Sequence, residues 1–227
     1  MGLQEKKMVI VTNIFHATDL DELLKFPPRK DQLAILARQR PEQAEAFFQE
    51  LMQTPFTVIG SVSKKNAVTD IRELLQDDIT EALCDDPFYE RWVSDMASVC
   101  QSFCDAQGED AVGFWLGSQR GCKRYHIDNV PLRTLVTYAG KGTEWLPDEA
   151  ADRAAFSSGA PNEGIVKDLS ARQFMNDWDV AMFRGGPKGL LHRTPDAALN
   201  APSLLMRLDH PSFWENILKQ GRGNHFT

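Results

Sequence analysis

Residues 122–146 read CKRYHIDNVPLRTLVTYAGKGTEWL, and we expect the rest of the chain to be organised around them. Within this stretch His126 and Asp128 form a His-x-Asp pair just before an apolar, strand-like run, and a glycine-rich turn follows that run. Side chains two residues apart on an extended backbone lie on the same face of the strand. The imidazole and the carboxylate are therefore expected to bind one metal ion together.

A third candidate ligand, His192, lies far along the chain at the end of another short apolar run. We expect this run to lie opposite the segment that carries His126. Two imidazoles and one carboxylate form a facial triad, which leaves the other side of an octahedral ion open for substrate and oxygen. The alternative for His126 and Asp128 is a hydrogen-bonded pair that orients a neutral imidazole without any metal.

The composition is that of an acidic globular protein, with 227 residues and a formal net charge of -7. Binding to phosphates needs an excess of clustered Lys and Arg, so we expect no nucleic-acid partner. The N-terminus lacks the apolar core of a signal peptide, and no apolar run approaches the roughly 20 residues of a membrane helix. We therefore expect a cytoplasmic protein without a membrane partner; the sequence leaves the substrate and the oligomeric state open.

Four cysteines are too few and too unevenly spread to predict a disulfide framework in a chain of this length. Cys100 and Cys104 lie four residues apart in a helical pattern and so share a face of the helix. They are either half of a metal site or, as we favour, two small buried side chains. Cys122 is a thiolate ligand in a zinc version of the site only if the chain bends before His126.

Apolar periodicity predicts one domain with a mainly helical part over 1–108, a strand-rich core over 109–209 and a C-terminal tail over 210–227. In the core, short β-prone runs separated by turn residues are typical of a sandwich or barrel. The expected helices cover 19–26, 41–50, 69–75 and 87–106, and the expected strands cover 8–15, 32–38, 56–62, 111–117, 132–139, 179–183, 189–191 and 203–208.

The order of three motifs resembles the iron(II)- and 2-oxoglutarate-dependent oxygenases. The motifs are His126-x-Asp128, the strand Asp179-Val180-Ala181-Met182-Phe183 and the Leu-His-Arg-x-Pro stretch that contains His192. This resemblance implies an α+β fold whose core is a double-stranded β-helix, jelly-roll or cupin-like, buttressed by N-terminal helices. It also implies an oxygenase of unknown substrate, with Fe(II) held by His126, Asp128 and His192 and with 2-oxoglutarate as cosubstrate.

Residues 137–146, TYAGKGTEWL, together with the Leu-His-Arg-x-Pro stretch, more closely resemble the bacterial domain of unknown function family 1826. This second resemblance covers most of the chain, whereas the oxygenase resemblance covers roughly 111–209. The family's association with zinc-responsive gene neighbourhoods implies an alternative function. On that alternative the protein binds Zn or handles metal on the same barrel without oxidation chemistry, and the three cysteines named above favour it.

The strand after His-x-Asp supplies further candidates. In the prolyl hydroxylase branch of these oxygenases, Thr and Tyr side chains on this strand help to hold the cosubstrate, which implies Thr137 and Tyr138. Adjacent residues on a strand point to opposite faces, so only one can line the pocket, and we favour Tyr138. Glu144 and Trp145 are candidate substrate-binding residues; the alternative for them is an ordinary hairpin with a packed Trp.

The resemblance also calls for a cation that pairs with the far carboxylate of 2-oxoglutarate, about ten residues past the distal His. Pro202 stands there instead, and the nearest basic residue on the expected strand is Arg207. A guanidinium suits a carboxylate because it can bind both oxygens. Arg207 is therefore the expected counter-charge, with Arg193 or Arg133 as alternatives.

Overall fold

The computed structural model describes residues 13–213, in which strands and helices are interleaved along the chain. The strands are β1 (Ile14–Ala17), β2 (Leu33–Leu36), β3 (Thr57–Ser63), β4 (Ala111–Gly117), β5 (Leu132–Ala139), β6 (Glu144–Leu146), β7 (Gln173–Phe174), β8 (Val180–Arg184), β9 (Leu191–Arg193) and β10 (Leu204–Asp209). The α-helices are α1 (Leu20–Leu23), α2 (Ala44–Leu51), α3 (Ala67–Leu75), α4 (Glu81–Cys84), α5 (Pro87–Gln107), α6 (Arg153–Ser157), α7 (Asn162–Ile165) and α8 (Asp196–Asn200).

These strands form two sheets, one of them large. The prediction of a fold that mixes helices and strands is confirmed. The larger sheet has the order β1-β2-β8-β5-β10-β4-β3, and the smaller has the order β7-β6-β9. Neighbouring strands run antiparallel, except for the parallel pair β1 and β2. Strands β1 to β3 join the larger sheet, so the part over 1–108 adds strands as well as helices. Most of the strand expected over 8–15 and most of the expected tail lie outside the described residues.

Three apolar clusters stack the elements in layers. The largest cluster joins the helices of the N-terminal part to one face of the larger sheet, through residues such as Trp92, Tyr138 and Met182. A second cluster fills the space between the two sheets, with Phe183 from the larger and Trp145 from the smaller. A third packs α6 and α7 against the outer side of the smaller sheet. Burial of these faces is the main stabilising contribution to such a layered domain.

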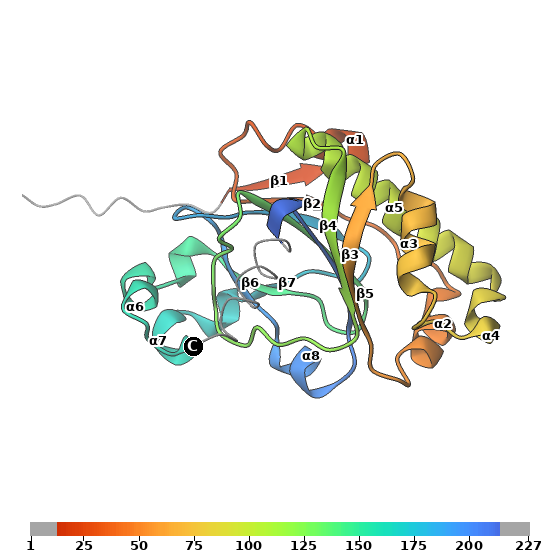
Figure 1. Ribbon diagram of the computed structural model, residues 1–227. Coiled ribbons are helices and arrows are strands. Elements are labelled where there is room, and N and C mark those ends of the chain that lie inside the picture. The colour runs from red at the N-terminus through yellow and green to blue at the C-terminus, as the bar shows by residue number, and fades with distance from the viewer. Residues whose placement is uncertain (1–12, 214–227) are drawn as a thin grey trace, which may run out of the picture.

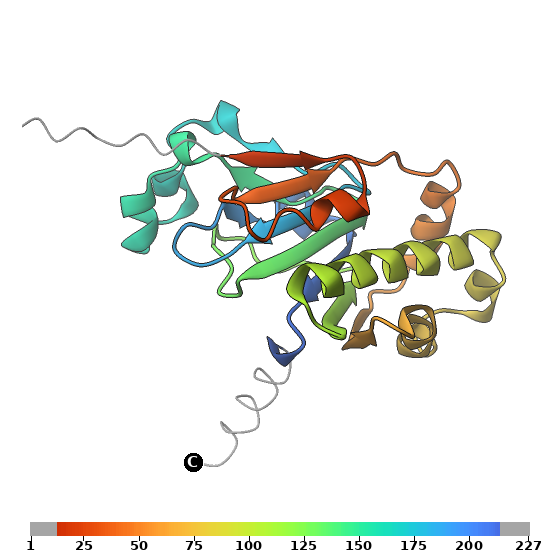
Figure 2. The same cartoon turned by 90° about the horizontal axis from the view of Figure 1, so that it is seen from above.

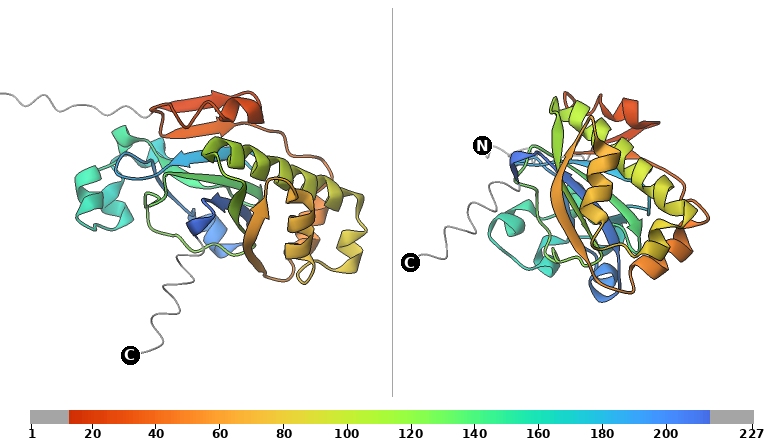
Figure 3. Two further views of the ribbon diagram at one scale, coloured as in Figure 1. Left: turned by 45° about the horizontal axis from the view of Figure 1, so that its top comes forward. Right: turned by 45° about the vertical axis from the view of Figure 1, so that its right-hand side comes forward.

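The views agree with this order of layers. Helices α2 to α5 gather on one side of the sheets, and α6 and α7 lie on the other side (Figure 1). From above, α5 lies along the face of the larger sheet (Figure 2). Two further directions show α6 and α7 far from α5 (Figure 3). The space between the two sheets, where the candidate ligands converge, is therefore flanked by helices on both sides.

Helix α5 has clear start and stop signals. Asp86 accepts a hydrogen bond from the Phe88 N–H at 2.7 Å, and Pro87 occupies the first turn, where its missing N–H costs nothing. Gly108 ends the helix in the left-handed conformation, with φ of 72°. Within residues 13–213 no helix combines the length and the apolar character that crossing a membrane requires.

Candidate metal centre

His126 and His192 lie side by side because their backbones pair. Each backbone N–H donates to the carbonyl oxygen of the other residue at 3.0 Å, which adds the segment around His126 to the edge of the smaller sheet next to β9. The two imidazole rings have their centroids 4.4 Å apart. The prediction that these segments lie opposite each other is confirmed.

The turn between β8 and β9 positions Asp128. The Gly186 N–H donates to the Asp128 carbonyl oxygen at 2.8 Å, and the Gly185 N–H donates to the Pro131 carbonyl oxygen at 3.0 Å. A Cβ on Gly185 would collide with the carbonyl oxygens of Val130 and Asp128. The turn can therefore approach the His-x-Asp segment this closely only without a side chain at that position.

The three predicted ligands converge at one point. One ligand atom from each of His126, Asp128 and His192 lies within 4.8 Å of the others. The His192 Nε2 is 3.4 Å from the Asp128 Oδ2, and the His126 Nε2 is 4.0 Å from the Asp128 Oδ1. Two imidazoles and one carboxylate, all gathered on one side of a point, match the facial geometry that leaves the remaining positions of an ion open.

The Nδ1 atoms of both imidazole rings are hydrogen-bonded, which leaves the Nε2 atoms available to a metal. The His126 Nδ1 is 3.0 Å from the Arg124 carbonyl oxygen, and the His192 Nδ1 is 3.0 Å from the Leu190 carbonyl oxygen. A carbonyl oxygen only accepts, so each Nδ1 carries a proton and each Nε2 is the ring nitrogen that can bind a metal. Burial lowers the pKa of His192 to about 4, which keeps this imidazole neutral at physiological pH.

The Asp128 carboxylate is held through one oxygen only. Its Oδ1 pairs with the Arg133 guanidinium, whereas its Oδ2 is buried and has no hydrogen-bond partner within residues 13–213. A buried carboxylate oxygen without a partner is costly. The unpartnered Oδ2 faces the His192 Nε2, so a metal ion fits the donor set and would relieve that cost.

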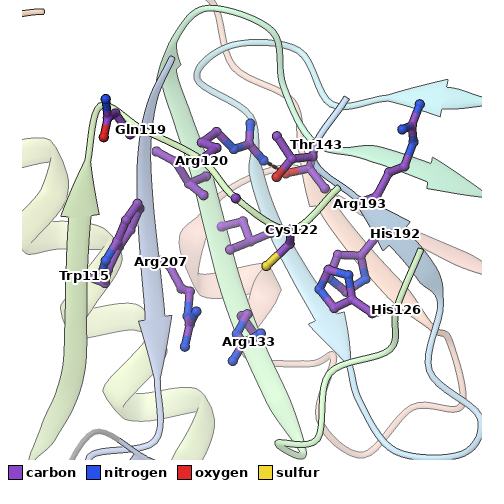
Figure 4. Close-up of a pocket in the computed structure, with 14 residues that line it drawn as sticks. Trp115, Gln119, Arg120, Cys122, His126, Arg133, Thr143, His192, Arg193 and Arg207 are labelled. Atoms are coloured by element: carbon purple, nitrogen blue, oxygen red, sulfur yellow. Dashed lines mark hydrogen bonds between the residues drawn. The ribbon is translucent and has the colours of Figure 1, made fainter. Parts of the chain in front are cut away.

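A pocket opens beside the triad and is rich in guanidinium groups. Arg133 and Arg207 lie near each other in it, and the two histidines lie beside them (Figure 4). The fully buried carboxylate of Asp209 accepts from the Arg133 Nε at 2.7 Å and from the Arg207 Nε at 2.6 Å. Asp209 thereby ties together the cation that holds Asp128 and the cation predicted to bind the cosubstrate.

Of the two candidates on β5, neither Thr137 nor Tyr138 lines this pocket. The buried Tyr138 hydroxyl donates to the Asp95 Oδ2 on α5 at 2.8 Å, on the face of the sheet that the helices cover. Burial raises the pKa of Tyr138 well above its usual value. The preference for Tyr138 as a cosubstrate residue is therefore corrected, because β5 turns this side chain toward the helices.

The other predicted contacts divide between the pocket and its surroundings. Arg193 lines the pocket, but its guanidinium pairs with Glu144 and with Asp196, both at 2.9 Å. Glu144 is buried, accepts from the Tyr125 hydroxyl and lines a different pocket. Trp145 is buried between the sheets, in register with His192. The structure thus does not bring Glu144 or Trp145 into the pocket beside the triad.

The cysteines do not join the triad. Cys100 and Cys104 are buried in the core on α5, as the favoured interpretation predicts, and burial raises the pKa of the Cys104 thiol to about 11. Cys122 is exposed and lines the pocket, but it is not one of the three clustered ligands. A zinc site that includes Cys122 as a ligand would therefore need a movement of the chain at Cys122.

Sequence reasoning missed two residues that shape the site. Asp209 follows Arg207 by two residues on β10, a spacing that places both on one face of the strand. That alternation was a usable signal for an Arg-Asp pair. Arg120 also lines the pocket, but it lies in the connection after β4, where no periodic pattern singles it out.

Comparisons with known proteins give one family and several distant structures. The family model described as "Protein of unknown function (DUF1826)" matches residues 18–209. The crystal structure of EctD from S. alaskensis with bound Fe is similar at 16% identity over 80% of this chain and 73% of that chain, with a TM-score of 0.38. The structure of EctD with 2-oxoglutarate and 5-hydroxyectoine gives the same values. A bsmA homolog from Methylobium petroleophilum PM1 is similar at 10% identity over 79% of this chain and 89% of that chain, with a TM-score of 0.35. No curated protein matches the sequence.

Proposed function

The chain belongs to the family described as "Protein of unknown function (DUF1826)", and from its triad we propose that it is an iron(II)- and 2-oxoglutarate-dependent oxygenase. The observation that carries the proposal is the set of donors itself. Two imidazole Nε2 atoms and an unpartnered carboxylate oxygen face one point. When bound there by His126, Asp128 and His192, iron(II) supplies the redox chemistry of oxygen that amino-acid side chains lack.

The pocket's own residues have separate tasks in this proposal. Arg133 holds the Asp128 Oδ1 and so turns the Oδ2 toward the ion. The carbonyl oxygens of Arg124 and Leu190 fix the two imidazoles in the ligating tautomer. These supports determine the affinity for the metal, because ligands that are already oriented lose little freedom when the ion binds.

The charge of the pocket supports an anionic cosubstrate. Asp128 and Asp209 offset Arg133 and Arg207, so these four side chains together are neutral. A divalent ion beside these four side chains then leaves the pocket positive. A dianion such as 2-oxoglutarate offsets that charge, and the electrostatic term is large because the site is partly removed from water.

The arrangement of strands supports the finer assignment of the fold as a double-stranded β-helix. Strands β4, β5, β8 and β10 are neighbours in the larger sheet. Strands β6, β7 and β9, joined by the segment around His126, face them in the smaller sheet. Two facing antiparallel sheets of four strands each are the jelly-roll arrangement that cupins use.

The test is reconstitution with iron(II) without oxygen, followed by addition of 2-oxoglutarate and then of air. We expect iron-dependent formation of succinate even without a substrate, and no succinate from His192→Ala or from protein loaded with zinc. The exposed variant Asp78→Asn is the matched control and should behave as wild type. Binding of iron without any binding of 2-oxoglutarate would contradict the oxygenase assignment.

Metal analysis distinguishes the oxygenase from the alternative function, a zinc-binding or metal-handling protein without oxidation chemistry. Metal analysis of protein made in ordinary medium gives its natural metal content. Full zinc occupancy that survives His192→Ala would show that the zinc site lies elsewhere. Full zinc occupancy that is lost with His192, together with no turnover of 2-oxoglutarate after iron loading, would favour the alternative.

A further inference from the structure

Arg120 differs from the other guanidinium groups that line the pocket. Arg133 and Arg207 pair with Asp209, and Arg193 pairs with Glu144 and Asp196. Arg120 forms no ion pair within the part of the chain that the structure describes; its contacts are with neutral groups only. Its charge is therefore the one in the pocket that no described carboxylate offsets.

The connection between β5 and β6 fixes the Arg120 side chain. Its Nη1 donates to the Lys141 carbonyl oxygen at 3.0 Å, and its Nη2 donates to the Thr143 Oγ1 at 2.8 Å. The Nε is buried and has no partner among the described residues. A guanidinium carries five N–H donors, so several remain for a ligand. Burial lowers the pKa of Arg120 to about 10, which leaves it cationic at neutral pH.

Thr143 adds a second donor at the same place. Its side chain is buried and lines the pocket, and its oxygen already accepts from Arg120. A hydroxyl that accepts one hydrogen bond can still donate its own proton to an anion. Arg120 and Thr143 lie together, apart from His126 and His192, with the pocket between the two groups (Figure 4).

We propose that Arg120 and Thr143 form a carboxylate subsite, which selects 2-oxo acids that carry a second carboxylate. The inference rests on the proposed function, because the 2-oxo acid end of the ligand lies at the triad. Arg207, the counter-charge expected from the sequence, is already paired with Asp209 and shares that carboxylate with Arg133. An incoming carboxylate gains more from Arg120, whose charge is desolvated and unpaired.

The experiment compares two ligands that differ only in the far carboxylate. Isothermal titration of the anaerobic, iron(II)-loaded protein measures the affinity for 2-oxoglutarate and for 2-oxopentanoate. We expect wild type to prefer 2-oxoglutarate at least about tenfold, the change that one charge-assisted hydrogen bond gives. Arg120→Gln should lose that preference because only the affinity for 2-oxoglutarate falls. Arg120→Lys should restore part of the preference.

Two further variants complete the design. Thr143→Val should reduce the preference several-fold, which keeps the proposal testable if Arg120→Gln does not fold. Arg72→Gln, on the exposed side of α3, is the matched control and should keep the full preference. A preference that persists in both Arg120→Gln and Thr143→Val overturns the subsite and leaves the proposed function standing. If iron-loaded wild type binds neither 2-oxo acid, both the proposed function and the subsite are overturned.

Discussion

In the proposed metal site, the affinity for the ion depends on the charge of the Asp128 carboxylate. Asp128→Asn removes the negative charge and leaves one oxygen and one amide nitrogen. In the orientation that keeps the oxygen on Arg133, the nitrogen replaces the unpartnered Oδ2. An amide is a much weaker ligand for a hard divalent ion than a carboxylate. We expect the dissociation constant for iron(II) to rise by more than about 100-fold, beyond the effect of typical supporting residues.

Equilibrium dialysis under nitrogen measures this change, and circular dichroism checks that the fold is kept. The control is again Asp78→Asn, an exposed carboxylate far from the triad in sequence. Equal iron affinity of Asp128→Asn and wild type would mean that this carboxylate is not a ligand. His126 and Asp128 would then be the metal-free pair that the sequence also allows.

Tyr138→Phe tests whether the Tyr138 hydroxyl stabilises the fold through Asp95 and takes no part in cosubstrate binding. The hydroxyl donates to Asp95, which also pairs with Arg38 at 2.6 Å, so Asp95 keeps one partner when the hydroxyl is removed. We expect the free energy of unfolding to fall by about 1 kcal/mol, the usual net contribution of a hydrogen bond. Binding of 2-oxoglutarate should not change. Denaturant titration and calorimetry measure the two effects, and a loss of 2-oxoglutarate binding in a stable Tyr138→Phe protein would restore the role expected from the sequence.

The sequence could not decide between Thr137 and Tyr138, because it does not show which face of β5 packs against the helices. Alternation shows that two neighbours point in opposite directions, but not which direction holds the helices. That choice depends on α5, which packs on the Tyr138 face of the larger sheet and whose Asp95 receives the hydroxyl. The cluster of His126, Asp128 and His192 was predictable because these residue types stand in the order that the oxygenase resemblance implies. Arg120 was not predictable, because only a tertiary contact with Thr143 places it in the pocket.

At the scale of elements, the turn between β8 and β9 connects the fold to the site. Gly185→Ala places a methyl group against the carbonyl oxygens of Val130 and Asp128, so the His-x-Asp segment must move. Overpacking of this kind costs about 1–3 kcal/mol of stability. We expect Gly185→Ala to be less stable and to bind iron(II) more weakly, because Asp128 shifts with its backbone.

Gly164→Ala on α7 is the matched control, since its Cβ would meet only the side chains of Ala160 and Pro161. Thermal unfolding and metal titration on both variants separate the local effect from a general effect of adding a methyl group. If Gly185→Ala binds iron(II) as wild type does, the turn does not position Asp128.

The long elements were predicted close to their bounds, whereas the very short strands of the smaller sheet were missed or shifted. The structure has β5 over Leu132–Ala139 and α5 over Pro87–Gln107, against expected ranges of 132–139 and 87–106. Such runs show several periods of the apolar pattern. Strands β6, β7 and β9 have three, two and three residues, which is too short for a period, and they form because the smaller sheet pairs them. The strand predicted over 189–191 lies at Leu191–Arg193, two residues later. Gly189 belongs to the preceding turn, where its N–H donates to the Gly186 carbonyl oxygen.

At the scale of the whole molecule, the triad joins segments that are distant in sequence. His126 and Asp128 precede β5, and His192 lies on β9, after strands β5 to β8. An ion bound by all three is bound by the native state and not by the unfolded chain. Metal bound at the proposed site therefore adds to the stability of the entire layered fold, and not only to that of the pocket.

The final prediction is the size of the stabilisation that a bound metal ion gives to the fold. At free metal of about 100 times the dissociation constant, the free energy of unfolding should rise by about 2.7 kcal/mol, and each kcal/mol should raise the melting temperature by about 2–4 °C in a domain of this size. Scanning calorimetry with iron(II) under nitrogen, and then with a chelator, measures the shift. The shift should vanish in His192→Ala and persist in Asp78→Asn. An equal shift in His192→Ala and wild type would show that the ion stabilises the protein from another site, because removing a ligand cannot leave the coupling intact.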